Sequence, residues 1–348
     1  MSAAVTVAVD ANGADLGPAE VARAAALAAS PGELHVLLFG PAAELGAPAE
    51  GVEVVDAPVS IAKAEDPARA VRANPDSSIV QAVEAVASGR ADALVAGGST
   101  GAALAASLFR IKRGRGIHRP ALAVLVPVPG APFLLLDAGA NVEVRPEHLV
   151  QFAYMGAAFM EAVIGIERPR VALLSNGEEP GKGTEEVVVA HAALAEGRGG
   201  LNFVGNLEGF AVGSGKADVI VADGFTGNVA LKVMEGTSAV LLGAVRSAAT
   251  SSARAKAGGM LLRPALRGLR DELDPQEHGG AVLLGLRKLA VVPHGSFGAK
   301  GIARAIELAA RGVRDDVVGQ TSERLAAAGA LRSAPEPSAA MSSVPDQS

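Results

Sequence analysis

Short apolar segments recur along the chain, and most of them are followed by a helical pattern rich in alanine. The segments lie at residues 5–9, 34–39, 52–55, 93–96, 121–126, 133–136, 171–174, 219–222 and 289–292. Continuous apolar character over roughly four to eight residues is typical of strands that are buried on both faces of a sheet. Alternation of such strands with helices predicts βαβ units and an α/β fold with a mainly parallel sheet.

The composition indicates a large core and no thiol chemistry. The chain has 348 residues, of which 49% are hydrophobic and 20% are charged. We therefore expect one α/β domain over residues 1–330. The absence of cysteine excludes thiolate nucleophiles, disulfides and cysteine-ligated metals, and it fits a reducing cytoplasm. A net charge of −6 and an aromatic content of 3% disfavour nucleic acid as a partner.

Small and polar residues follow six of the predicted strands. These loops lie at residues 10–13, 97–101, 137–141, 175–179, 223–228 and 294–296. Any one of them is explained equally well by the glycine, asparagine and aspartate that turns require. In an open α/β sheet, however, ligands bind outside the carboxyl ends of the strands. Six such loops therefore predict a binding site along one rim of the sheet.

The loop 97–101 has the residues of an anion-binding site. Gly97, Gly98 and Gly101 flank Ser99 and Thr100, and an alanine-rich helical pattern follows. Glycine-rich loops at the start of a helix present several backbone N–H groups to an anion, and Ser99 or Thr100 can cap the helix. Neither the Walker sequence nor a G-x-G-x-x-G fingerprint is present, so we do not predict a nucleoside triphosphate site.

Two further loops carry candidate catalytic side chains. Lys182 lies between two glycines after Glu178 and Glu179, where it can bind phosphate or polarise a thioester carbonyl. The alternative is a solvated turn before the next helix. Asn228 follows a loop with Gly224 and Gly227, and it can donate to an oxyanion or cap the helix.

The histidines and serines predict no metal site and no hydrolase triad. His294, in the loop 294–296, completes the set of rim loops. The other histidines are dispersed, and none has metal-ligand spacing with another. If acyl transfer occurs, direct attack by a bound oxyanion is the simplest route, and no cofactor is expected.

Residues 254–278 predict a protruding helical hairpin with a basic face. Leu262, Leu266, Leu269 and Leu273 fall at helical spacing, and Pro264 is a candidate start of the second helix. The basic face of this hairpin is a candidate docking surface. Its residues are Arg254, Lys256, Arg263, Arg267 and Arg270. A second basic cluster comprises Arg110, Lys112, Arg113, Arg115 and Arg119. Each cluster is otherwise an ordinary solvated face.

We expect neither a signal peptide at the N-terminus nor a membrane span. The N-terminus reads as a first strand, and no stretch reaches the ~18 consecutive apolar residues of a membrane span. The tail 331–348 is rich in serine, proline and alanine and is predicted to be disordered.

In combination, the loops resemble the PlsX family of phosphate acyltransferases over roughly residues 5–315. The motifs that carry the resemblance are V-D-A-N-G-A-D-L-G-P at 9–18, L-D-A-G-A-N-V at 136–142, G-E-E with K-G at 177–183, N-F-V-G-N-L-E-G at 202–209, D-G-F-T-G-N-V at 223–229 and H-G-S at 294–296. The sequence departs from the family pattern at Asn12, Ala14, Ser99 and Phe297.

The resemblance implies a Rossmann-like α/β/α sandwich, a homodimer and transfer of a fatty acyl group from acyl carrier protein to inorganic phosphate. The acyl phosphate would feed a membrane glycerol-3-phosphate acyltransferase in phospholipid synthesis. The enzyme would be cytoplasmic, with peripheral membrane contact through the hairpin. Two alternatives stay open: a phosphate acyltransferase that uses coenzyme A thioesters, and a weakly active homologue that organises other proteins at the membrane.

The resulting hypothesis assigns a role to each loop. Backbone donors of residues 97–101 and 224–228 hold phosphate, Lys182 and Asn228 offset charge on the carbonyl oxygen, and phosphate attacks the thioester. The candidate catalytic residues are Lys182, Asn228 and His294. The candidate substrate-binding residues are Asp10, Gly98, Ser99, Thr100, Gly101, Asp137, Asn141, Glu178, Asp223, Gly224 and Gly227.

Overall fold

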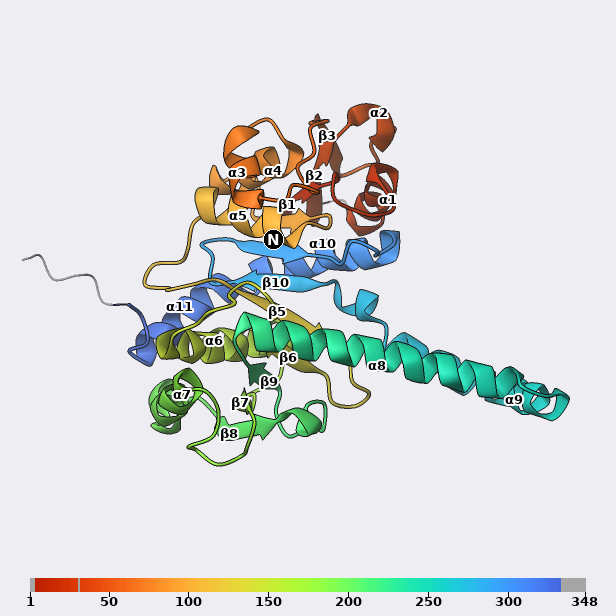
Figure 1. The fold of residues 1–348 in the computed structure, drawn as a ribbon. Helices are drawn as coiled ribbons and strands as arrows, with labels where there is room; N and C mark the ends of the chain where they lie inside the picture. Colours follow the sequence, from red (N-terminus) through yellow and green to blue (C-terminus); the bar gives the residue numbers. More distant parts are fainter. Residues whose placement is uncertain (1–3, 31, 333–348) are drawn as a thin grey trace, which may run out of the picture.

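The computed structural model describes residues 4–30 and 32–332, and its centre is a single sheet of 11 strands (Figure 1). The strand order is β3-β2-β1-β4-β11-β10-β5-β6-β9-β7-β8. The strands are β1 (Val5–Asp10), β2 (Leu34–Gly40), β3 (Val52–Asp56), β4 (Ala93–Ala96), β5 (Ala121–Val126), β6 (Phe133–Leu136), β7 (Val171–Ser175), β8 (Phe203–Glu208), β9 (Val219–Val221), β10 (Ala281–Leu284) and β11 (Leu289–Val292). All nine predicted strands are present, and β8 and β10 are additional.

Helices cover both faces of this sheet, which confirms the α/β/α sandwich. The longer helices are α1 (Pro18–Ala28), α3 (Pro67–Ala73), α4 (Ser78–Ala87), α5 (Thr100–Arg110), α6 (Pro146–Phe159), α7 (Glu185–Ala195), α8 (Gly224–Thr250), α9 (Ala253–Glu272), α10 (Ala299–Arg314) and α11 (Val317–Ala327). Shorter turns are α2 (Ala42–Leu45), the π-helical η1 (Met160–Ile164) and the 3-10 turns η2 (Arg198–Gly200), η3 (Gly209–Ala211) and η4 (Pro275–His278).

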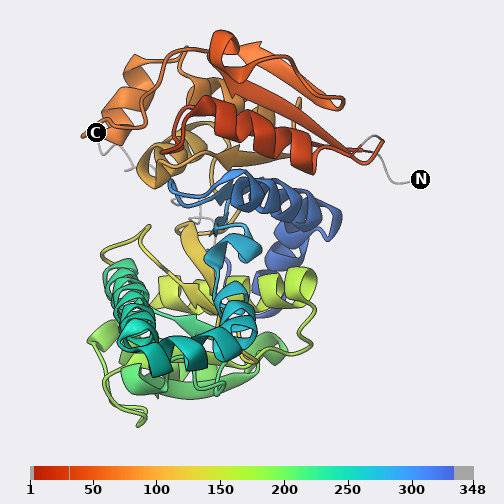
Figure 2. The same ribbon diagram turned by 90° about the vertical axis from the view of Figure 1, so that its right-hand side faces the viewer.

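Alternate residues of each strand enter different hydrophobic clusters, because successive side chains point to opposite faces. Val7 and Val9 join the cluster that contains side chains of α1, α6, α7, α10 and α11. Ala8 joins the cluster that contains side chains of α4 and α5. The first turns of α8 pack on that second face, through Ala230 and Met234. Figure 2 shows α8 on one side of the sheet and α10 on the other.

The strands form two parallel blocks that run in opposite directions. The β3-β2-β1-β4-β11 block is parallel, and so is the β6-β9-β7-β8 block. Between the blocks, the pairs β11–β10, β10–β5 and β5–β6 are all antiparallel. Three reversals invert the second block, so its carboxyl ends lie at the opposite edge. The prediction that all six loops share one rim is therefore wrong.

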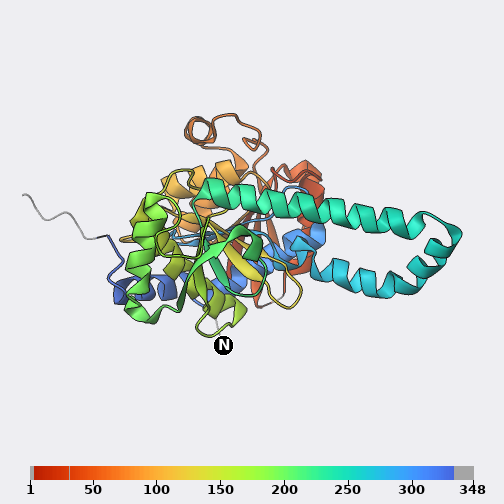
Figure 3. The ribbon, with the colours of Figure 1, turned by 60° about the horizontal axis from the view of Figure 1, so that its bottom comes forward.

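The helical hairpin is confirmed, but it is longer than predicted and has different arms. The first arm is α8 and the second is α9, which continues through Pro264 as one helix (Figure 3). Side chains are exposed on both sides of Pro264, so water can satisfy the carbonyl group that loses its helical partner. The predicted disorder of 331–348 falls almost wholly outside the described residues, and the division into domains stays a prediction.

Candidate active site

The first group of predicted site residues lies where the loops after β1, β4 and β11 meet. The N–H of Gly97 donates to the carbonyl of Asp10 at 3.1 Å, and the N–H of Asp15 donates to the carbonyl of Gly295 at 2.8 Å. Gly98 has φ +140°, and a Cβ atom there would lie 2.2 Å from the carbonyl oxygen of Gly13. Only glycine allows this approach of the two loops.

Three backbone donors at the start of α5 are available to a ligand. Ser99 caps the helix, since its hydroxyl accepts from the N–H of Ala102 at 3.3 Å. Within the described part of the chain, the N–H groups of Ser99, Thr100 and Gly101 have no hydrogen-bond partner. Free N–H groups at the positive end of a helix favour an anion, as the sequence predicted for this loop.

Asp10 lies beneath this group and holds it together. Its side chain is buried, and burial raises its pKa to about 6, although hydrogen bonds from Ser78 and Asn12 oppose the shift. The side-chain amide of Asn12 donates to the carbonyl of Ala57 and to the hydroxyl of Ser78, both at 3.0 Å. Asp10 therefore supports the loop from below rather than facing a ligand.

His294 is the exposed member of the first group. Its Nδ1 lies 2.8 Å from the hydroxyl of Ser296 and accepts from the Ser296 N–H at 3.3 Å. With Nδ1 occupied in this way, Nε2 is the nitrogen left for a ligand. His294 can therefore donate one hydrogen bond at the edge of the α5 site.

The second group joins the loop after β6 to the start of α8. The side-chain amide of Asn228 donates to the carbonyl of Ala138 at 3.0 Å. The N–H of Gly224 donates to the carbonyl of Asn141 at 2.7 Å. A Cβ at Gly227 would lie 2.0 Å from the carbonyl oxygen of Asp137. Both glycines of the loop 223–228 are therefore required by backbone packing.

The backbone of residues 224–227 is not free to bind phosphate, and this part of the hypothesis is wrong. The N–H groups of Phe225 and Thr226 donate to the carboxylate of Asp223 at 3.0 and 2.8 Å, and that of Gly227 donates to the Asp223 carbonyl at 2.9 Å. The N–H of Gly224 is bound to Asn141. Asp223 thus acts as the helix cap, and a side-chain amide hydrogen of Asn228 is the donor that remains.

The third group is the loop after β7, which carries Lys182. This side chain is exposed and has no ion-pair partner among the residues that the structure describes. Its backbone is fixed, because the N–H of Lys182 donates to Glu179 at 3.0 Å and the side chain of Asn206 donates to the Glu179 carbonyl at 2.9 Å. Glu178 instead forms an ion pair with Lys216 at 3.0 Å, so it has a structural partner that the sequence did not predict.

The second and third groups share one edge of the sheet, since β7 pairs with β9 and both strands run in the same direction. The first group lies at the opposite edge, but the helix that follows it, α5, packs on the same face of the sheet as the first turns of α8. Leu104 and Leu108 of α5 belong to the same hydrophobic cluster as Ala140 and Leu231, which flank the second group. The starts of α5 and α8 thus both lie over one face of the sheet. This face, rather than a rim, is where a common site can form.

One cluster of possible metal ligands was not expected from the sequence. Ligand atoms of His118, Glu147 and His148 lie within 4.8 Å of one another. However, Nδ1 of His148 already accepts from the N–H of Arg145 at 3.1 Å, whereas a metal-bound histidine usually donates from its second nitrogen. Burial, with a smaller effect of neighbouring arginines, lowers the pKa of both histidines, and the positive charge of those arginines opposes a cation. We do not assign a metal here.

Comparisons with known proteins identify the family. Residues 5–320 match the family described as "Fatty acid synthesis protein". The phosphate acyltransferase of Pelotomaculum thermopropionicum is 44% identical over 315 residues, covering 89% of this chain and 92% of the relative. That of Heliobacterium modesticaldum is 43% identical over 328 residues, covering 92% of this chain and 97% of the relative. The chain belongs to the PlsX family of phosphate acyltransferases.

Solved structures agree with this assignment at the level of the fold. The EutD phosphotransacetylase from Staphylococcus aureus aligns with a TM-score of 0.58 at 17% identity, covering 89% of this chain and 94% of the other. A phosphotransacetylase from Streptococcus pyogenes aligns with the same TM-score at 18% identity, covering the same shares. PlsX-family membership, which rests on sequence, therefore coincides with the α/β architecture described above.

Proposed function

We propose that this member of the PlsX family transfers a fatty acyl group from acyl carrier protein to inorganic phosphate. An oxygen of phosphate attacks the thioester carbonyl carbon, a C–O bond forms, and the C–S bond breaks. The products are acyl phosphate and the carrier thiol, which takes up a proton. The observation that carries this proposal is the family membership together with free anion donors at the start of α5.

The residues divide the chemistry between the two helix starts. The free N–H groups of Ser99, Thr100 and Gly101 hold phosphate, because aligned backbone donors stabilise an anion without reorganisation. Across the face, Asn228 and Lys182 offset the negative charge that develops on the carbonyl oxygen. His294 borders the phosphate site and donates from Nε2. Asp10, Asp137 and Asn141 hold the loops rather than contacting substrate.

We propose the basic groove beside α5 as the docking site for the carrier protein. It has a volume of about 1150 Å³ and is lined by Lys112, Arg113, Arg115, Arg287 and Arg332, with Glu323 as the acidic residue of the lining. Leu108 and Phe109, near the end of α5, contribute to its apolar lining. Acyl carrier proteins are acidic, so a basic groove here steers the thioester toward the site.

We assign the hairpin to self-association and membrane contact rather than to the carrier. Lys256, Arg263 and Arg270 line a groove of about 800 Å³ between its arms, whereas Arg254 and Arg267 lie outside that lining. Large apolar side chains are exposed along it, including Val240, Met260 and Leu261 at 71%, 73% and 84%. A patch of this kind favours a homodimer or a lipid surface over water.

Only α8, of the helices described, is long and apolar enough to cross a membrane, with none of its apolar window buried. Its start is fixed to the body through Asp223 and Gly224, so we propose peripheral contact only. This location would also suit delivery of acyl phosphate to a membrane glycerol-3-phosphate acyltransferase.

The deciding experiment is acyl phosphate formation by the purified protein from acyl carrier protein thioester and phosphate. We expect turnover with the wild-type chain, and a loss of about 100-fold or more in Lys182→Ala and Asn228→Ala, the range seen when an oxyanion donor is removed. Lys216→Ala is the matched control, because that lysine is bound to Glu178. Failure of the wild-type chain to form acyl phosphate would refute the proposal.

The nearest alternative is a phosphate acyltransferase that uses coenzyme A thioesters. The same assay with a coenzyme A thioester of the same acyl group distinguishes it from the proposed function. We expect this thioester to react more slowly, because it lacks the acidic carrier that the basic groove attracts. Lipid binding without turnover on either donor would instead favour the organising homologue.

A further inference from the structure

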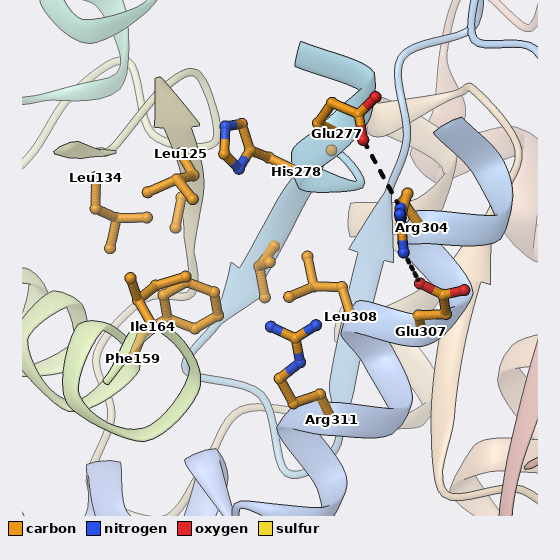
Figure 4. A pocket seen from close by; sticks show the side chains of 13 residues that line it. Leu125, Leu134, Phe159, Ile164, Glu277, His278, Arg304, Glu307, Leu308 and Arg311 are labelled. Carbon is orange, nitrogen blue, oxygen red and sulfur yellow. Dashed lines mark hydrogen bonds and ion pairs between the residues drawn. The ribbon is translucent and has the colours of Figure 1, made fainter. Parts of the chain in front are cut away.

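A second cavity lies on the other face of the sheet, away from α5 and α8. It has a volume of about 260 Å³ and is bounded by α10, by η4 and by the end of α6 with η1. Its apolar wall consists of Leu125, Leu134, Phe159, Ile164 and Leu308, and its polar rim consists of Glu277, His278, Arg304, Glu307 and Arg311 (Figure 4). None of the residues proposed for acyl transfer lines it.

The charges on the rim leave one cation free. Arg304 is held by Glu307 at 2.7 Å and lies 3.9 Å from Glu277. Arg311 has no carboxylate partner in the described part of the chain, and in Figure 4 its guanidinium points toward the space between Leu308 and Phe159. Burial lowers the pKa of His278, so its ring is a neutral hydrogen-bonding group near pH 7. The cavity therefore presents one unpaired positive charge beside an apolar wall.

The backbone has an unusual conformation beside this cavity. The last turn after α6, Met160–Ile164, is π-helical and ends at Gly165 with φ 80°. Single π turns are uncommon and are found frequently at functional sites. Here the π turn places Ile164 in the cavity wall beside Phe159.

We infer that this cavity binds a small aliphatic monocarboxylate, with its carboxylate on Arg311 and its chain against the apolar wall. A guanidinium pairs with a carboxylate in a bidentate geometry that an uncharged head group cannot reproduce. At about 30 Å³ per water-sized atom, the volume suits a ligand of roughly nine non-hydrogen atoms, which corresponds to a chain of about six to eight carbons. The inference goes beyond the proposed acyl transfer and does not depend on it.

The test is calorimetric titration of the whole protein with octanoate and with 1-octanol. We expect octanoate to bind, and 1-octanol to bind at least about tenfold more weakly because it lacks the charge. Arg311→Met should lower the affinity for octanoate by about tenfold or more, and Arg311→Lys should restore part of it. Arg270→Met, on the hairpin, is the control and should change nothing. Arg311 is exposed, so the variants should fold.

Three results would overturn the inference. The first is the absence of octanoate binding at millimolar concentration. The second is equal affinity for 1-octanol, and the third is unchanged octanoate binding in Arg311→Met, which would place the ligand elsewhere. Lys182→Ala should bind octanoate normally. This variant distinguishes binding in the cavity from binding at the proposed transferase site. Acyl phosphate formation is measured in a separate assay. Its outcome does not decide whether octanoate binds, and octanoate binding does not decide whether acyl phosphate forms.

Discussion

The carboxylate of Asp137 accepts two hydrogen bonds from Asn141, one from its backbone N–H at 2.7 Å and one from its side-chain amide at 2.8 Å. The other oxygen of Asp137 accepts from Leu122, Gly139 and Ala140 at 2.9–3.0 Å. The side chain is fully buried. Asp137 therefore ties β5, β6 and the loop beneath α8 together, and both of its oxygens act only as acceptors.

Replacing Asp137 should destabilise the protein strongly. Asp137→Ala removes the acceptor of five N–H donors, three of them in buried hydrogen bonds, and we expect the free energy of unfolding to fall by about 3 kcal/mol or more. Asp137→Asn should be nearly as harmful, because its NH₂ group would face N–H donors. Urea denaturation measures both. Asp271→Ala, on the exposed surface of α9, should change stability by less than about 0.5 kcal/mol. An Asp137→Asn protein as stable as wild type would contradict the acceptor role.

Much of this architecture was predictable because it depends on local patterns. Nine strands followed from continuous apolar runs, and the loop 137–141 was recognised from its residues. The role of Asp137 was not, since a substrate-binding aspartate and a buried structural one have the same neighbours in sequence. The donors that distinguish them include Leu122, which the fold brings from another strand.

The direction of the second block of strands could not be read from apolar runs. It depends on β10, whose four residues follow a glycine pair and give little signal, and on the antiparallel pairing of β5 with β6. The short link 127–132, with Pro127, Pro129 and Gly130, was the available indication, because parallel neighbours need a longer crossover. The cluster of His118 with His148 was hidden for the same reason, since it forms only once β5 and α6 are adjacent.

The burial of Asp10 predicts a pH dependence of stability. Its pKa is raised from 3.8 to about 6 in the folded protein, so the folded chain keeps a proton that the unfolded chain has lost. Stability therefore falls as the pH rises from about 4 to about 6, by roughly 3 kcal/mol from this group. Asp10→Asn cannot titrate, so the difference in unfolding free energy between wild type and variant should shift in this window. Parallel pH profiles for both proteins would contradict the assignment.

Gly98 should tolerate alanine far less than other glycines do. Gly98→Ala places Cβ against the carbonyl of Gly13 and forces the loops after β1 and β4 apart, which should cost about 1–3 kcal/mol and raise the KM for phosphate. Gly17 has φ +85° but open space around it, and Gly181 has open space and no positive φ. We expect the order of destabilisation Gly98, Gly17, Gly181, measured by thermal unfolding. Equal effects at Gly98 and Gly181 would exclude the close approach.

The two basic clusters can be separated by charge reversal. Lys112 and Arg115 are exposed in the groove beside α5, whereas Arg263 and Arg267 lie on the hairpin. If the carrier docks in the groove, Lys112→Glu with Arg115→Glu should raise the KM for acyl carrier protein by about tenfold and leave kcat nearly unchanged, because rim charges act mainly on association. The salt dependence of kcat/KM should weaken as well. The coenzyme A thioester should be unaffected.

The hairpin pair, Arg263→Glu with Arg267→Glu, is the matched control with the same change in charge. It should leave the KM for the carrier protein unaltered and should instead reduce binding to vesicles of anionic lipid. A reversed outcome, with the hairpin variant losing affinity for the carrier and the groove variant retaining it, would move the docking site to α9. In either case acyl phosphate formation at saturating substrate should persist, because neither cluster contacts the reacting atoms.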